Sequence, residues 1–276
     1  KPSFLGTKVF KDYDLNELKE SIDWSPFFMT WELKGKYPNI FKDAKIGKEA
    51  KNLFDDAQRM LQDIIDQKLL TAKAVIGFFP VNSVGDDIEL YTADDRKKVR
   101  IIFHTLRQQV EKFDAKPYYA LSDFIAPKAT GVKDYLGGFA VTAGVGLDDL
   151  VKKYKQDHDD YSGIMVTSLA DRLAESFAER MHELVRKQFW GYAPDEDLDE
   201  EAFLQCRYRG IRPAPGYPAC PDHTEKTLLF DLLAVETNTG IYLTENYAMI
   251  PASSVSGIYF AHPDSKYFAL GNITKD

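Results

Sequence analysis

The sequence predicts an α+β fold in which a central, mainly antiparallel sheet is flanked by long helices. Two observations favour this class. Helical periodicity extends over 46–67 and over about 161–190, whereas short apolar runs between and after them are typical of strands. The strand-like runs do not alternate regularly with helices, so a parallel βαβ sheet is not expected. No Pro-, Ser- or Gly-rich linker divides the chain, and 1–276 is expected to be one domain.

The first half of the chain predicts two helices and several strands. A short helix is expected over 14–20. The helix over 46–67 follows from apolar residues at the 3.6-residue period, namely Ile46, Ala50, Leu53, Phe54, Ala57, Leu61, Ile64 and Ile65. The apolar run 74–79, which Pro80 ends, indicates a buried strand. The further strands expected are a hairpin of 88–91 with 99–103 around the charged stretch 94–98, and two strands over 118–124 and 139–142.

The second half begins with the longest predicted helix. Its apolar stripe consists of Met165, Leu169, Leu173, Phe177, Met181 and Leu184. The acidic stretch 195–201 predicts a short helix that ends near Gly210. Asp222, with Glu225 three residues later, predicts the N-cap of a helix that Gly240 stops after Thr239. Strands are expected over 247–250, 258–260 and 267–270.

Composition excludes several classes of function. The net charge of −8 argues against nucleic-acid binding, which requires a basic surface. The sequence contains no run of about 18 apolar residues, so no membrane span is predicted, and no signal peptide is recognisable. Cys206 and Cys220 lack zinc-site spacing and indicate free thiols in a reducing compartment, so a cytoplasmic location is expected. The chain begins at Lys1 and lacks an initiating Met, which suggests a fragment of a longer protein.

The stretch 212–226 is the most distinctive part of the sequence. Four prolines fall within ten of its residues, at positions 213, 215, 218 and 221, and each fixes its own φ and restricts the residue before it. The resulting stiff loop also carries an Arg, a Gly, a Tyr and a His. Such a loop can hold a ligand at little ordering cost, although a rigid surface turn would have the same stiffness.

The pattern Arg212-x-x-x-Gly216-Tyr217, within RPAPGYPACPDHTEK, resembles the S-adenosylmethionine-binding signature of the C-terminal activation domain of cobalamin-dependent methionine synthase. Further stretches similar to this family run in order along nearly the whole chain. They are IDWSPFF (22–28) with Trp31, GKYP (35–38), LRQQ (106–109), SDFIAP (122–127), DRLAE (171–175) and HPDSKY (262–267).

The resemblance implies a curved domain that binds S-adenosylmethionine in a surface groove and presents its methyl group to cob(II)alamin. This reductive remethylation reactivates an enzyme that transfers a methyl group from methyltetrahydrofolate to homocysteine. The implied partners are the cobalamin-binding domain of the same enzyme and a flavodoxin-type reductant, and any zinc belongs to another domain of the parent enzyme. Two alternatives stay open: a free-standing S-adenosylmethionine-dependent methyltransferase, and an interaction module with a vestigial ligand site.

The proline-rich stretch supplies four candidate ligand contacts. Arg212 could bind the ligand carboxylate through its guanidinium fork, although a surface salt bridge is the alternative. Ala214 and Gly216 leave room for backbone groups to approach a ligand, and Tyr217 could border the adenosyl group. Asp23 is placed by the resemblance at a ribose hydroxyl or adenine amine, with a helix-capping role as the alternative.

The remaining candidates follow from the long helix and the end of the chain. Asp171, Glu175, Glu179 and His182 share one side of the helix, which could be no more than a solvated acidic face. The resemblance assigns Glu175 to the ligand's positive charge and Asp171, with His223, to possible contact with the partner domain. It also assigns ligand contact to the 267–268 pair. Tyr267 keeps its phenol, whereas Phe268 replaces a Tyr common in the family and can offer only a ring or backbone contact.

Three weaker patterns carry no further chemistry. Gly144-Val-Gly146 lacks the third glycine of a dinucleotide loop and indicates a turn. Glu179-x-x-His182 has no second copy for a di-iron site, and Arg186 replaces the second His of HExxH. These patterns give only weak support to a metal site or a nucleophile. The resemblance implies that the domain supplies no acid, base or nucleophile of its own and contributes positioning and electrostatics.

Overall fold

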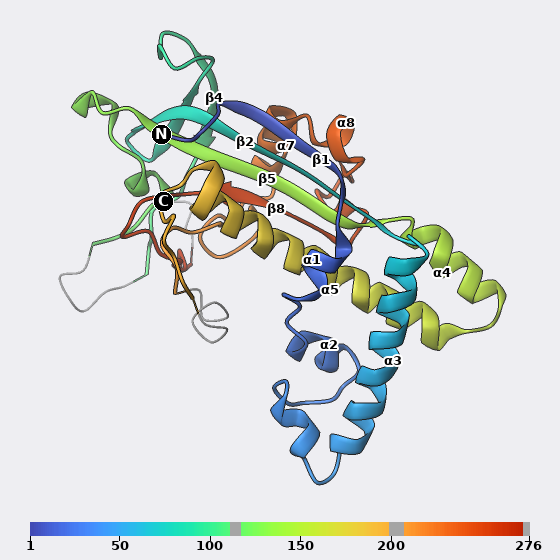
Figure 1. Cartoon of the computed structure of the whole chain (residues 1–276). Coiled ribbons are helices and arrows are strands. Elements are labelled where there is room, and N and C mark those ends of the chain that lie inside the picture. The colour runs from blue at the N-terminus through green and yellow to red at the C-terminus, as the bar shows by residue number, and fades with distance from the viewer. Residues whose placement is uncertain (111–116, 199–206, 273–276) are drawn as a thin grey trace.

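The molecule is built on an antiparallel sheet in which hairpins join β2 to β3 and β3 to β4, and long helical segments connect β1 to β2 and β5 to β8 (Figure 1). The computed structural model describes residues 1–110, 117–198 and 207–272. In this part of the chain six strands pair in the order β4–β3–β2–β5–β8, and β1 also pairs with β2. Every pairing among them is antiparallel, which confirms the predicted α+β class. The strands are β1 (Gly6–Tyr13), β2 (Thr71–Val84), β3 (Asp87–Tyr91), β4 (Val99–His104), β5 (Asp134–Val145) and β8 (Ser254–Tyr259), and a separate small sheet pairs β6 (Tyr242–Leu243) with β7 (Met249–Ile250).

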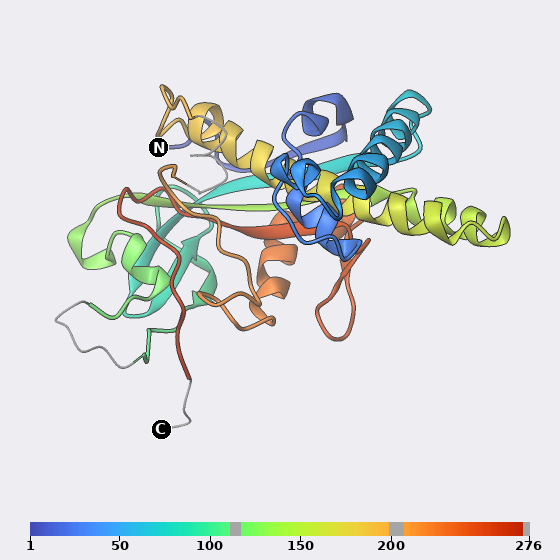
Figure 2. The ribbon, with the colours of Figure 1, turned by 90° about the horizontal axis from the view of Figure 1, so that it is seen from below.

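Helices cover both faces of the sheet. They are α1 (Leu15–Lys19), α2 (Ser25–Thr30), α3 (Gly47–Asp66), α4 (Leu147–Gln156), α5 (Asp160–Leu184), α7 (Glu225–Leu233) and α8 (Val235–Thr239), with 3-10 turns η1 (Asn39–Lys42), η2 (Leu121–Phe124) and η3 (Lys128–Thr130) and a π-helical turn η4 (Val185–Phe189). Figure 2 shows α5 on one face of the sheet and α7 on the other. None of the described helices is long and apolar enough to cross a membrane.

This arrangement explains the continuous apolar runs of the two central strands. In β2, Ile76 and Phe78 pack toward α5, whereas Val75 and Phe79 pack into the core beneath α7. Since successive side chains point to opposite faces, a strand covered on both sides is expected to be apolar along the stretch where both faces are covered.

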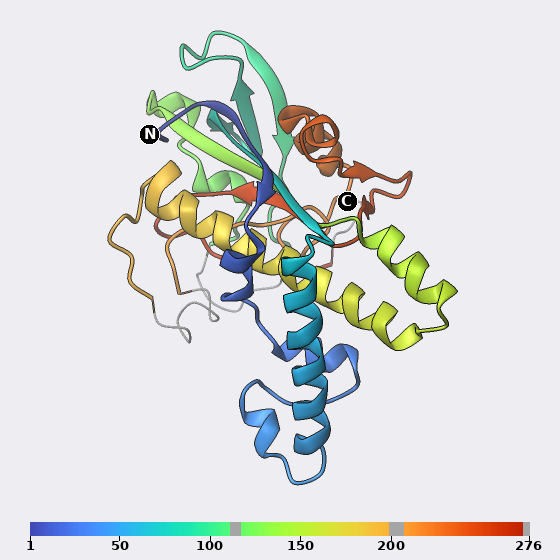
Figure 3. The same cartoon turned by 45° about the vertical axis from the view of Figure 1, so that its right-hand side comes forward.

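The N-terminal helices form an extension beyond one end of the sheet (Figure 3). α3 descends from the start of β2, and α2 packs beside it through the aromatic contact of Phe28 with Phe54; Phe28 also contacts Phe41 of η1. α4 and α5 pack as an antiparallel pair. Helix α5 begins at Asp160, where the Asp159 carboxylate caps it by accepting a hydrogen bond from Ser162 N. The predicted helices over 14–20, 46–67 and 161–190 are therefore present, with the last turn of the longest in π geometry.

Several strand predictions are wrong in extent or kind. β5 extends beyond the predicted 139–142 at both ends, β8 begins at Ser254 and not at 258, and β1 was not predicted. β2 does not end at Pro80 but continues to Val84. Pro80 is tolerated because β1 pairs with β2 as far as Phe78 and β3 pairs only from Val81, so no neighbour on that side needs its missing N–H. Of the predicted strand 118–124, residues 121–124 form the turn η2, in which the Asp123 carboxylate accepts a hydrogen bond from Ala120 N. Residues 267–270 form an irregular segment along the surface.

The predicted helix over 222–239 is also different in the structure. Asp222 is not its N-cap: its carboxylate accepts hydrogen bonds from Thr224 N and Oγ1 in a turn before the helix, which begins at Glu225. Ala234 then adopts a left-handed conformation, with φ of 48°, and divides the segment into α7 and α8. The predicted short helix that begins at 195 lies largely outside the described residues.

Candidate functional site

A groove of about 500 Å³ opens at the edge strand β8. Four parts of the chain form it: α5, the sheet, the proline loop (residues 211–223) and the C-terminal segment (residues 267–270). The residues that line it are Phe139, Glu175, Arg212, Pro213, Ala214, Tyr217, Pro218, Ala219, Val255, Ser256, Tyr267, Phe268 and Ala269. Six of the sequence candidates therefore lie in one groove, although they are up to 93 residues apart in the chain.

The proline loop is held against β8 by backbone hydrogen bonds. Ile211 exchanges two hydrogen bonds with Phe260, and Ile258 N donates to Pro213 O at 2.9 Å. Gly257 allows this approach, because a Cβ at that position would lie 2.9 Å from Pro213 O. The loop thus extends the edge of the sheet, which places the side chains of Arg212 and Ala214 at the groove.

Arg212 is held by an ion pair within the protein. Its Nη1 and Nη2 donate to the two carboxylate oxygens of Glu179, and Nη1 also donates to Tyr208 Oη at 2.7 Å. Burial is the largest single effect on the pKa of Arg212 and lowers it, but the Glu179 charge, with Tyr208 and Tyr267, raises the pKa overall. These contacts use the Nη end of the guanidinium, and among the described residues no hydrogen bond involves Nε. The Nε edge remains available to a ligand.

A neutral histidine completes the support of Arg212. His182 is fully buried, and burial, followed by the charges of Arg212 and Arg186, lowers its pKa well below the ordinary value. Arg212 Nη1 lies 3.3 Å from His182 Nδ1, and Tyr192 Oη lies 3.3 Å from Nε2; a cation beside Nδ1 favours the tautomer whose proton is on Nε2. The imidazole therefore positions the guanidinium without adding charge.

Glu175 lies one helical turn before Glu179 and lines the same groove. Its side chain is exposed, and no described residue forms a hydrogen bond or ion pair with its carboxylate. By contrast, Glu179 is occupied by Arg212. Of the two acids, Glu175 is thus the one free to attract a positive group in the groove.

Gly216 and Tyr217 form a tight turn at the tip of the proline loop. Gly216 N donates to Cys220 O at 2.7 Å, and Cys220 N donates to Tyr217 O at 2.8 Å. The φ of Gly216 is +98°, and a Cβ there would lie 2.2 Å from the ring of His223. A Cβ at this position would strain the backbone and require His223 to shift, and the turn leaves Tyr217 64% exposed at the mouth of the groove.

The C-terminal segment forms the opposite wall. Tyr267 Oη accepts a hydrogen bond from Arg212 N at 3.0 Å, so its phenol contacts the proline loop. The Phe268 ring packs near Tyr119 and Phe124, with centroid distances of 6.2 and 6.4 Å, and also lines the groove. Position 268 can thus offer a ring surface there without the phenol.

Gly216 shapes the loop tip without lining the groove, and the three remaining candidates do not line it either. Asp23 borders a different cavity of about 290 Å³, and its carboxylate accepts a hydrogen bond from Ser25 N at the start of α2. Asp171 accepts a hydrogen bond from Ser253 Oγ at 2.6 Å. His223 lies behind the loop tip, where Lys226 Nζ approaches its Nδ1 at 3.3 Å. These three keep their assignments only as predictions from the resemblance.

Sequence reasoning missed the residues that hold Arg212. Glu179 and His182 had been weighed only as members of an acidic face and of an incomplete metal motif, and Tyr208 was not considered. The available signal was their spacing from Glu175 on one side of the helix, at i+4 and i+7. Within 1–110, 117–198 and 207–272, no three His, Cys, Asp or Glu side chains are placed to hold a metal ion.

Two comparisons with known proteins agree with this geometry. A family model described as the activation domain of vitamin B12-dependent methionine synthase matches residues 14–276. A crystal structure of the MetH reactivation domain bound to AdoHcy is similar with a TM-score of 0.96 and 52% sequence identity. The match covers 99% of this chain and 83% of that chain. The similarity therefore extends over the sheet, the helices and the groove together.

Proposed function

Since the chain belongs to the family of the vitamin B12-dependent methionine synthase activation domain, we propose that its groove binds S-adenosylmethionine and presents the methyl group to cob(II)alamin. The observation that carries this proposal is that Arg212, whose Nε edge is open, and Glu175, whose carboxylate has no partner among the described residues, line the same groove. S-adenosylmethionine carries a carboxylate together with an ammonium and a sulfonium. The similar MetH reactivation domain was solved with AdoHcy, the demethylated form of this ligand.

The candidates in the groove, with Gly216 at the loop tip, each have a role in this proposal. Arg212 donates to the ligand carboxylate, and Glu175 stabilises the positive charge of the ammonium and sulfonium. Ala214 and Gly216 allow the backbone of the proline loop to approach the ligand, while Tyr217, Tyr267 and Phe268 supply ring surface. The protein contributes orientation and electrostatics, and cobalamin supplies the cobalt that accepts the methyl group.

The groove is open on one side, where Tyr217 and Tyr267 are 64% and 49% exposed. An open mouth suits a site onto which a cobalamin-binding domain of the same enzyme docks. We propose that residues 1–276 form one domain of a vitamin B12-dependent methionine synthase, the methyltransferase that moves a methyl group from methyltetrahydrofolate to homocysteine. Its flavodoxin-type reductant and cytoplasmic location stay predictions from the family.

Calorimetric titration of the chain with S-adenosylmethionine, and separately with S-adenosylhomocysteine, tests the ligand site. We expect saturable binding of both at one site. A folded chain that binds neither ligand would overturn the proposal and favour an interaction module with a vestigial groove.

A further inference from the structure

The C-terminal wall of the groove lies outside the sheet, so something else must fix its position. Leu270 N donates to Pro218 O at 3.3 Å, and Leu270 O accepts from Gln109 N at 2.7 Å. The neighbouring carbonyl, Ala269 O, accepts from the side chain of Gln108 at 2.9 Å. Ala269 itself lines the groove. The segment 107–109 is thus the support behind this wall.

Gln108 connects the wall to a second segment. Its Nε2 donates to Ala269 O, while its Oε1 accepts from Tyr119 N at 3.0 Å. The Gln108 backbone N also donates to Tyr119 O at 2.9 Å. One amide side chain therefore bridges the wall and the residue whose ring packs against Phe268.

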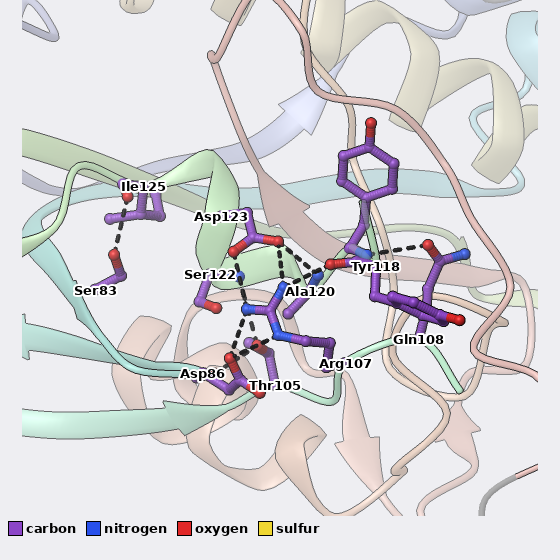
Figure 4. A network of polar contacts seen from close by, with 11 residues as sticks. Ser83, Asp86, Thr105, Arg107, Gln108, Tyr118, Ala120, Ser122, Asp123 and Ile125 are labelled. Atoms are coloured by element: carbon purple, nitrogen blue, oxygen red, sulfur yellow. Dashed lines mark hydrogen bonds and ion pairs between the residues drawn. The ribbon is translucent and has the colours of Figure 1, made fainter. Parts of the chain in front are cut away.

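Arg107 anchors this bridge to the sheet (Figure 4). Its guanidinium donates to both oxygens of Asp123 at 2.7 and 2.9 Å, and to Asp86 in the turn between β2 and β3 at 2.5 and 3.1 Å. It also donates to Tyr118 O at 2.6 Å. A guanidinium held by two carboxylates and a carbonyl has a single orientation, which fixes the neighbouring Gln108.

We propose that Gln108 is a positioning residue for the S-adenosyl ligand, since it holds the C-terminal wall in its binding geometry before the ligand arrives. The inference rests on the proposed function of the groove. Gln108 is not among the residues that line the groove, so its effect passes through Ala269. A wall that is ordered in advance avoids the entropy cost of ordering on binding.

The test replaces Gln108 by Met, which has a similar length but neither amide group. We expect the Kd for S-adenosylhomocysteine to rise about tenfold, because the wall must then be ordered by the ligand itself. Hydrogen–deuterium exchange should increase over 267–270 in the free variant and return toward the wild-type rate when ligand saturates it. The melting temperature should stay close to that of the wild type, which separates positioning from general destabilisation.

Gln62→Met is the matched control, because Gln62 also uses both amide atoms, toward Asp66 and Lys19, but lies on α3. Its Kd should equal that of the wild type. If Gln108→Met fails to fold, Gln108→Glu keeps the acceptor for Tyr119 and removes the donor to Ala269, and the same result is expected. An unchanged Kd with unchanged local exchange would overturn the inference. If the wild type bound no ligand, the proposed function would be overturned. Exchange over 267–270 in the free proteins would still show whether Gln108 orders the C-terminal wall.

Discussion

At the scale of single residues, some charged groups of the groove form an ion pair within the protein, whereas another has no partner and could meet a ligand. Arg212 and Glu179 neutralise each other, with side-chain exposures of 15% and 21%, and neutral His182 adds no charge. Glu175 remains as the unpaired charge among the groove residues described here. The groove is therefore suited to a ligand whose reactive end is positive.

Glu175→Gln should weaken binding of S-adenosylmethionine more than binding of S-adenosylhomocysteine, whose sulfur is uncharged. We expect a difference of about 1 kcal/mol, because one partly solvated charge pair is lost. Calorimetry with both ligands measures it. Glu236→Gln, on the exposed side of α8, is the control and should change neither affinity. Equal losses for the two ligands would show that Glu175 does not sense the sulfonium.

Arg212→Met should lower the free energy of unfolding by about 3 kcal/mol, because it leaves the Glu179 carboxylate partly buried without its partner. Adding Glu179→Met should then cost less than the sum of the single changes. A double-mutant cycle measured by urea unfolding gives the coupling. The exposed pair Lys51–Asp55 is the matched control, and its coupling should stay below about 1 kcal/mol. Additive losses at Arg212 and Glu179 would contradict the ion pair.

At the scale of elements, apolar periodicity correctly predicted those helices and strands whose position is determined by burial in the core. The pattern over 46–67 gave α3 almost to the residue, because one face of that helix is buried throughout. Runs 118–124 and 267–270 have strand-like composition, but side chains satisfy several of their backbone groups, Asp123 from within the first run and Arg107 and Gln108 from outside both. Asp123, Arg107 and Gln108 take the role that a neighbouring strand would have. Local sequence does not show such partners.

The same limit applies to the site. The stiff loop and its glycine were predictable, because proline and left-handed glycine act locally. The partner of Arg212 was not predictable, since Glu179 lies 33 residues earlier in the chain, on helix α5. Asp23 was assigned to the ligand by resemblance, yet in the structure it borders another cavity.

Gly216→Ala tests the turn at the tip of the loop. We expect about 1–2 kcal/mol of destabilisation from the left-handed φ, and a further loss of ligand affinity because the new Cβ displaces His223 or the loop. Gly240→Ala shares the positive φ but has open space around it, so it should lose similar stability and no affinity. Urea unfolding and calorimetry separate the two effects. Equal affinities for both variants would mean that the tip is free to adjust.

At the scale of the whole molecule, the groove exists only when the chain is fully folded, because its walls come from α5, two strands, a loop and the C-terminal segment. Its support also ties the stability of the fold to pH. His182 is buried among Arg212, Arg186, Tyr208, Tyr192 and Tyr259 and cannot accept a second proton without adding a third positive charge.

The free energy of unfolding should therefore fall as pH drops below about 6.5, where the unfolded chain protonates this histidine and the folded chain does not. The contribution of one such group is about 1.4 kcal/mol per pH unit. His182→Gln should remove that slope between pH 7 and 5 in urea unfolding. His104 contributes in the opposite sense, because Asp87 raises its pKa and its stabilisation is lost as pH rises. A slope that survives His182→Gln would place the titration elsewhere.

The pairing of the proline loop with β8 has a second consequence, for the behaviour of the chain in solution. An edge strand with free N–H and C=O groups invites pairing with another molecule and then aggregation. Here Ile211 and Pro213 occupy the edge of β8 through their backbone hydrogen bonds to Phe260 and Ile258. Pro213 has no N–H to donate to a strand of a second molecule. The loop that would hold the ligand thus also shields the sheet from self-association. Shortening it should cost solubility as well as affinity, which light scattering would detect.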